Sequence, residues 1–173
     1  MKTSLKTKDL AVMGVMAAIV FISQVALSFL PNIELVTLLF ILYTLVIGRK
    51  VFGVVYAFVF LEGITYGFGL WWINYLYVWT VLCFITLVFR KQTSFVFWSI
   101  ISGFFGLAFG ALCSLLYFFI SGPSGAFAYW IAGIPSDITH CIGNVFLCLI
   151  LFKPLHYISV SYTHLTLPTT PYV

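Results

Sequence analysis

The side chains able to do chemistry are few, and several of them lie close together near the C-terminus. Asp137 is followed by His140, Cys141 and Asn144 at three, four and seven residues, so a helix presents them on one face. This stripe could bind a polar ligand or could be hydrogen-bonded packing. Its Asp-x-x-His spacing could also ligate a metal, but no third strong ligand is apparent. We expect a binding face, with Pro135 either starting that helix, so that Asp137 caps it, or kinking it.

Two more acidic residues lie in apolar stretches. Glu62 is about eleven residues into a predicted helix with no Lys or Arg at its depth. Because a carboxylate in the middle of a bilayer costs about 2.5–3.5 kcal/mol, we expect it to line a polar cavity; the alternative is a protonated group bonded to a neighbouring helix. Glu34 follows Pro31 and Asn32 at the expected start of the second helix. Its negative charge could stabilise the N-terminus of that helix, with Asn32 as the cap, or its carboxylate could bind a ligand. The two roles are compatible.

Aromatic residues supply the walls of a pocket. They gather at the predicted outer ends of the third, fourth and sixth helices: Trp71, Trp72, Tyr75, Tyr77, Trp79, Tyr129 and Trp130. A belt at the membrane interface explains part of this enrichment, but the opposite ends lack comparable Trp. We therefore expect an outer mouth with aromatic walls and a polar floor, suited to a small, flat, polar ligand.

The composition sets the class of protein that must position these residues. Of the 173 residues, 63% are hydrophobic and 7% charged, whereas soluble domains carry about 25% charged residues. The net charge of +4 does not indicate nucleic-acid binding, because the basic residues are separated into four short clusters by apolar stretches of about 40 residues. The clusters are Lys2, Lys6 and Lys8; Arg49 and Lys50; Arg90 and Lys91; and Lys153.

A turn signal near the middle of each apolar stretch divides it into two helices. The expected spans are about 9–30, 33–48, 51–70, 72–89, 95–120 and 128–152. Two helices per cluster place all the basic residues on one side, which the positive-inside rule assigns to the cytoplasm. The sequence therefore predicts an all-α integral membrane protein, a bundle of six transmembrane helices with both termini cytoplasmic.

The domain organisation is simple. Residues 1–158 form one predicted transmembrane domain, and 159–173 change abruptly to a polar composition, SVSYTHLTLPTTPYV. We expect this segment to be a disordered tail or an artefact of sequencing, and it carries none of the predicted site.

Small residues mark close contacts between helices. Gly14 and Ala18, with Ala11 before them, form a small-xxx-small pattern on the first helix, and Gly106 and Gly110 do so on the fifth. We expect the fifth-helix glycines to pack inside the bundle and the first-helix residues to face a partner.

The chain lacks the sequence signatures of several enzymatic and transport activities. The chain has no nucleotide-binding G-x-x-x-x-G-K-[ST], no G-x-S-x-G and no H-E-x-x-H, so it does not itself hydrolyse ATP by the P-loop route. It also lacks the paired halves of a stand-alone secondary transporter.

Over residues 1 to about 158, the chain resembles the substrate-binding (S) components of energy-coupling factor (ECF) vitamin transporters. The resemblance rests on six helices in a short chain and on the segments AVMGVMAA, FLPNIELVTLL, GFGLWWINYLYVW and AYWIAGIPSDITHCIGN. It implies a protein that captures a vitamin from outside and passes it to a transmembrane coupling subunit driven by two ATPase subunits. No cofactor and no enzymatic activity of its own are implied.

The resemblance also places the functional residues. In that family the ligand lies near the outer ends of the later helices, under the loop between the first two, where this chain has Glu34, Trp72, Asn74, Tyr75, Tyr129, Asp137 and His140. Glu62 and Asn144 complete the expected site. Family members contact the coupling subunit through an Ala-x-x-x-Ala pattern on the first helix, matched here in spacing by Gly14 and Ala18, with Gly in place of the first Ala.

Two alternatives come from other functional classes. One is a small membrane enzyme in which Asp137 and His140 are acid and base, and the other is a structural subunit of a larger membrane complex. For a binding protein, the acidic and aromatic residues favour a cationic or hydrogen-bond-rich heteroaromatic ligand.

Overall fold

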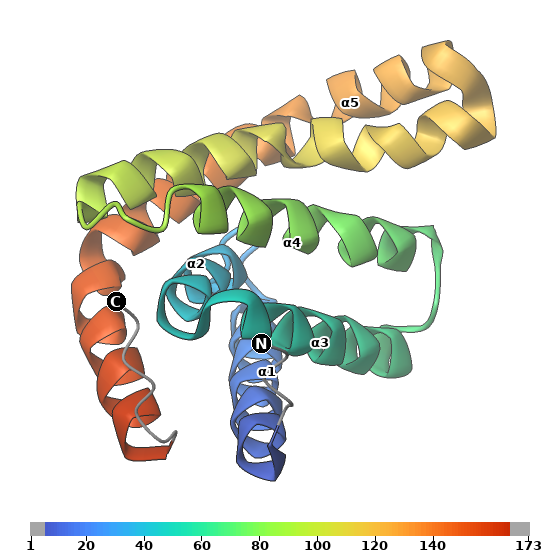
Figure 1. Cartoon of the computed structure of the whole chain (residues 1–173). Coiled ribbons are helices and arrows are strands. Elements are labelled where there is room, and N and C mark those ends of the chain that lie inside the picture. The colour runs from blue at the N-terminus through green and yellow to red at the C-terminus, as the bar shows by residue number, and fades with distance from the viewer. Residues whose placement is uncertain (1–5, 167–173) are drawn as a thin grey trace.

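The computed structural model describes residues 6–166, and in that part of the chain all regular structure is helical. The elements are α1 (Thr7–Leu27), α2 (Val36–Ile47), the short 3-10 helix η1 (Gly48–Lys50), α3 (Val51–Tyr66), α4 (Leu70–Val88) and α5 (Phe95–Thr166), shown in Figure 1. The first four expected spans agree with α1 to α4 to within four residues at each end.

Helix α5 folds back on itself at a single glycine. Gly122 has φ 72° and ψ −176°, a backbone conformation that only glycine adopts readily, and it divides α5 into arms 95–121 and 123–166. Figure 1 shows the yellow-green first arm and the orange second arm side by side. Pro123 starts the second arm, where its missing N–H costs nothing and its fixed φ suits a first helical residue. The helix therefore resumes five residues earlier than the expected position 128.

The two arms touch through the glycines of the first arm. A Cβ built on Gly106 would lie 2.9 Å from the backbone of His140 and Cys141, and one built on Gly110 would collide with the Asp137 carboxylate. The prediction that these glycines pack inside the bundle is confirmed. Their lack of a side chain lets two backbones approach closely.

Pro135 lies inside the second arm, so the interpretation of Pro135 as a first helical residue with Asp137 as cap is wrong. Pro123 already starts this arm, and no non-helical torsion occurs at Pro135. Pro135 cannot donate a backbone hydrogen bond one turn back, but its own carbonyl accepts one from Thr139 Oγ1 at 3.1 Å.

The C-terminal part of α5 extends past the expected domain boundary. Residues 159–166 continue α5, and 167–173 lie outside the described residues, so the interpretation of 159–173 as a disordered tail or a sequencing artefact stays a prediction. In Figure 1 these red turns run at an angle to the orange arm.

Four helical stretches of the described chain are long and apolar enough to cross a membrane: Thr7–Leu27, Val36–Tyr66 (α2, η1 and α3 counted together), Leu70–Val88 and Phe95–Ser161. Large apolar side chains cover the outside of these helices, among them Phe104 at 69% and Phe119 at 84% exposed. A surface of this kind is typical of a protein solvated by lipid.

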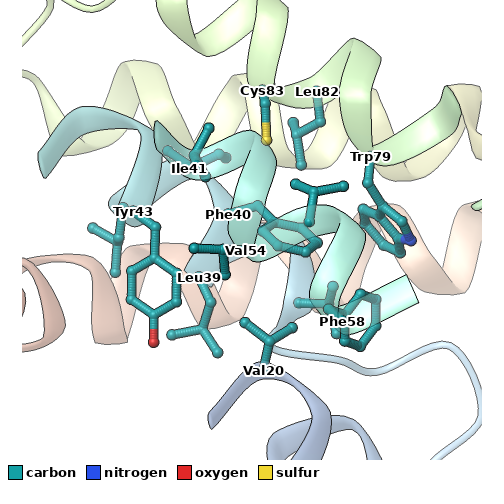
Figure 2. Packing of buried hydrophobic residues seen from close by; sticks show 14 of the residues in the cluster. Val20, Leu39, Phe40, Ile41, Tyr43, Val54, Phe58, Trp79, Leu82 and Cys83 are labelled. Carbon is teal, nitrogen blue, oxygen red and sulfur yellow. The ribbon is translucent and has the colours of Figure 1, made fainter. Parts of the chain in front are cut away.

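Helix α2 forms the centre of the molecule. Every residue from Val36 to Thr44 is buried, because α1, α3, α4 and α5 all pack against this helix. Figure 2 shows Phe40 of α2 beside Phe58 of α3 and Trp79 of α4, with ring centroids 5.6 and 5.5 Å from that of Phe40. This aromatic cluster forms the core below the cavity described next.

Candidate ligand-binding cavity

A cavity of about 400 Å³ opens between the C-terminal ends of α1 and α3, the N-terminal half of α4 and both arms of α5. The irregular segment 28–35, between α1 and α2, covers one side of it. Its polar lining includes Gln24, Glu34, Glu62 and His140, which belong to four different parts of the chain, and further polar side chains also line it: Ser28, Asn32, Tyr66 and Tyr75. The volume is within the usual range for small-molecule sites.

Helix α2, which begins next to the cavity, is short. Its 12 residues rise about 18 Å, whereas the hydrocarbon core of a bilayer is about 30 Å thick. The space beyond its N-terminus is taken by segment 28–35 and by the cavity. Irregular backbone at membrane depth is tolerated where it is buried in protein or lines such a cavity.

Segment 28–35 is fastened to α5 at its turn. Asn32 adopts a left-handed backbone with φ 59°, and its Nδ2 donates to Ser136 Oγ at 3.3 Å. The prediction that Asn32 caps the second helix is therefore wrong. Glu34 does this instead: its Oε1 accepts the backbone N–H of Thr37 at 3.3 Å and the Thr37 hydroxyl at 2.6 Å.

Glu34 also bonds across the cavity to α5. His140 Nε2 lies 3.0 Å from the same Oε1, and because a carboxylate oxygen only accepts, the imidazole N–H donates. The two side chains are only 15% and 7% exposed. Both expected roles of Glu34 are thus compatible, since it starts α2 and presents polar surface to the cavity.

Asn144 extends this network away from the cavity. Its Nδ2 donates to Thr37 Oγ1 at 3.3 Å and to the Ser102 carbonyl at 3.2 Å, which connects the second arm of α5 with α2 and with the first arm. Asn144 is buried and does not line the cavity, so its contacts position Glu34 and His140 indirectly.

Glu62 lies at the buried side of the cavity, 1% exposed. Gln24 Nε2 of α1 donates to its Oε2 at 3.3 Å. The second oxygen of Glu62 and the oxygen of Gln24 have no hydrogen-bond partner within the described chain. The expectation that Glu62 faces a polar cavity agrees with this placement.

One wall consists of aromatic rings from a single face of α4. Trp71, Tyr75 and Trp79 are four residues apart, with successive ring centroids 5.3 and 5.5 Å apart. Phe109 continues the wall from the first arm of α5, 5.7 Å from Trp79 and 5.0 Å from the His140 ring. A flat ligand in the cavity would meet ring faces and edges on this side.

Two predicted residues of α4 face away from the cavity. Trp72 donates from Nε1 to the Val59 carbonyl of α3 at 2.8 Å. Asn74 accepts the hydroxyl of Tyr77 at 2.9 Å through Oδ1 and is buried. Neither lines the cavity: Trp72 joins α4 to α3, and the bond of Asn74 lies within α4.

Two predicted residues of α5 are also outside the lining. Tyr129 stacks on Tyr117 of the opposite arm, with ring centroids 4.0 Å apart. Asp137 accepts the backbone N–H of Gly110 at 3.0 Å through Oδ1, so it holds the two arms together. Of the nine predicted binding residues, the cavity brings together Glu34, Glu62, Tyr75 and His140.

Gln24, Tyr66 and Phe109 line the cavity but are not among the residues predicted from sequence, whereas Trp71 and Trp79 belong to the predicted aromatic wall and do line it. Two features of the sequence point to some of these residues. Gln24 is the only Gln within a predicted span, and the spacing of Trp71, Tyr75 and Trp79 places them on one helical face.

Within the described residues, no group of three or more His, Cys, Asp and Glu side chains is placed to hold a metal ion. Comparison of the chain with protein-family models, curated proteins and solved structures finds no match. The function must therefore be argued from the geometry of the cavity.

Proposed function

We propose that this protein is the membrane-embedded binding subunit of an ECF-type importer, which captures a vitamin or related small molecule from outside a prokaryotic cell. The observation that carries the proposal is the cavity itself: a few polar side chains, among them Glu34, Glu62 and His140, and an aromatic wall enclosed by helices whose outer surfaces are apolar. Few polar groups fix the orientation of a ligand in such a site, and apolar walls supply contact area.

The topology that we propose has six crossings, with α2 and α3 as separate spans and each arm of α5 as one, and with both termini cytoplasmic. Contacts at the basic ends support it. Lys50 Nζ lies 3.0 Å from Asp9 Oδ1, and Lys153 Nζ lies 4.3 Å from the centre of the Phe95 ring. In Figure 1 the α3–α4 loop and the bend of α5 lie on one side of the view, and the α4–α5 loop lies on the other. The basic clusters then face the cytoplasm together.

The outer face of α1 suits docking on a transmembrane coupling subunit. Ala11 and Gly14 are exposed, Ala18 is half-buried, and a Cβ built on Gly14 meets no atom within 4 Å. Small residues on a lipid-facing surface let a partner helix approach closely. Two ATPase subunits bound to that partner would supply the energy, since this chain has no nucleotide-binding motif.

The enzyme alternative is less well supported by the geometry. An acid and a base must face the same substrate, but Asp137 bonds to Gly110 outside the cavity, whereas His140 lines it. The arrangement therefore favours binding over catalysis by this pair.

The proposal is tested with the purified chain and with cells. Mass spectrometry of small molecules that co-purify in detergent should identify one compound, and cells should accumulate that compound only when this chain and an ECF coupling module are expressed together. Uptake by this chain without the module would refute the importer assignment. Absence of any co-purified molecule, together with normal function after Glu62→Gln, would favour a structural subunit.

A further inference from the structure

Buried polar atoms without a hydrogen-bond partner gather around the cavity. Among the described residues five such side-chain atoms occur, and three belong to residues of the lining: Gln24 Oε1, Glu62 Oε1 and Trp79 Nε1. A buried polar group that lacks a partner costs free energy, so an unpaired group in a native structure needs an explanation. A ligand that pairs these atoms supplies one.

The two unpaired oxygens can each accept a hydrogen bond from a donor on the ligand. Gln24 Nε2 bonds to Glu62 Oε2, which fixes the amide and the carboxylate beside each other and leaves one acceptor on each. A molecule with two N–H groups on one edge can bond to both. Hydroxyl groups could also donate to these oxygens, but the negative charge of the site favours cationic N–H groups over neutral hydroxyl groups.

The charge of the lining is uncompensated. Glu34 bonds to His140, whereas Glu62 forms no ion pair among the described residues: its hydrogen-bond partner is the neutral Gln24, and the Glu34 carboxylate lies near enough to act on it as a second negative charge. The described lining contains no Lys or Arg. A carboxylate buried to 1% exposure is strongly disfavoured unless a cation or several donors accompany it, and hydrogen bonds between ionised partners are the strongest.

The aromatic wall completes the description of the ligand. Trp71, Tyr75, Trp79 and Phe109 provide ring surfaces, which attract flat molecules and also cations. The indole nitrogen of Trp79 points away from the Phe40 ring in Figure 2 and has no partner, so it offers one donor to an acceptor on the ligand.

We propose that the cavity selects a flat cation that carries N–H donors, of the amidinium or protonated amino-heteroaromatic class. Its N–H edge bonds to Glu62 and Gln24, and its ring lies against the α4 wall. This inference rests on the proposed function and adds the chemical class of the substrate and the residues that recognise it.

Four probes that share one phenyl ring test the inference: benzamidine, benzamide, benzoate and benzyltrimethylammonium. The first is a cation with N–H donors, the second is neutral, the third is an anion, and the last is a cation without donors. Calorimetric titration of the full chain in detergent, freed of co-purified ligand, should give a Kd for benzamidine at least tenfold below that of each other probe.

Substitutions of Glu62 and Gln24 test whether their two unpaired oxygens cause the preference for benzamidine. In Glu62→Gln the tenfold preference for benzamidine over benzamide should fall to threefold or less. Gln24→Met removes one acceptor and leaves the carboxylate, so it should reduce the preference by a smaller factor. It replaces Glu62→Gln as the test if that variant does not fold. Asp9→Asn is the matched control, since it converts a carboxylate to an amide at the opposite end of α1 and should keep the full preference.

Three outcomes would overturn the inference: benzoate or benzyltrimethylammonium binding as tightly as benzamidine, no measurable binding of any probe, or an unchanged preference in both variants. None of these refutes the proposed function, which depends on the co-purified compound and on uptake with the coupling module. Conversely, selective binding of benzamidine without such uptake would leave the inference standing and remove the importer assignment.

Discussion

The contact between Glu34 and His140 should contribute measurably to stability, because it joins the start of α2 to α5 in a buried setting. The perturbation is a double-mutant cycle with Glu34→Gln and His140→Phe. Glutamine keeps an oxygen for Thr37, and phenylalanine keeps an aromatic ring beside Phe109. The cycle therefore isolates the 3.0 Å contact between the two side chains.

The magnitude follows from burial. A hydrogen bond to a charged group contributes about 1.5–3 kcal/mol, and at 7% and 15% exposure the pair is little screened by water. We expect a coupling free energy of about 2 kcal/mol. For a chain of this length, this corresponds to a deviation from additivity of about 4–8 °C in the unfolding temperature.

The ion pair between Lys50 and Asp9 is the control. Lys50 and Asp9 are also 3.0 Å apart, but the lysine side chain is 29% exposed. Exposed pairs contribute about 0–1 kcal/mol, so a cycle with Lys50→Met and Asp9→Asn should give the smaller coupling. Both cycles are measured on ligand-free protein in one detergent by tryptophan fluorescence during heating. Additivity at Glu34 and His140 within about 0.5 kcal/mol would refute the reasoning.

Three further predictions concern packing. Phe40→Ala should lower the free energy of unfolding by about 3–5 kcal/mol because it empties the centre of the aromatic core, whereas Phe119→Ala, at an exposed site, should change it little; equal unfolding temperatures would contradict this. Gly106→Leu should prevent folding by separating the arms of α5, which size-exclusion chromatography would show as loss of the monodisperse peak. The Gly14→Leu variant should fold and bind ligand, but it should abolish uptake with the coupling module. Asn144→Leu should cost about 1–3 kcal/mol in thermal unfolding, since it leaves buried acceptors unpaired; an unchanged midpoint would refute that role.

The elements could be predicted well because the sequence marks their ends. Apolar stretches of suitable length ended by Gly48 and Gly67 define α2 and α3, and both glycines adopt positive φ. The bend of α5 was harder to locate, since Ser121–Gly125 contains two glycines. Only Gly122 leaves the helical conformation, and Pro123 then permits the helix to resume at once.

The site could be predicted only in part, for a physical reason. Helix α4 is apolar on all sides, so its sequence does not show which face meets the cavity. Trp71 and Trp72 are adjacent in sequence, but one lines the cavity and the other bonds to Val59. Glu34, Glu62 and His140 were found because an ionisable group in an apolar span needs a polar neighbour. Asp137 has the same property, but its Oδ1 accepts a backbone N–H in the contact between the arms of α5, and the residue does not line the cavity.

The short length of α2 has a consequence for biogenesis. A helix of 12 apolar residues is too short to insert into a bilayer as an independent span, which takes about 20 residues. It must enter together with α3 as a hairpin joined at Gly48, and its full burial requires α4 and α5, which are synthesised later. A nascent chain that has reached only residue 66 therefore exposes the helix that lies at the centre of the finished protein. Assembly of this protein in the membrane is completed from its C-terminal half.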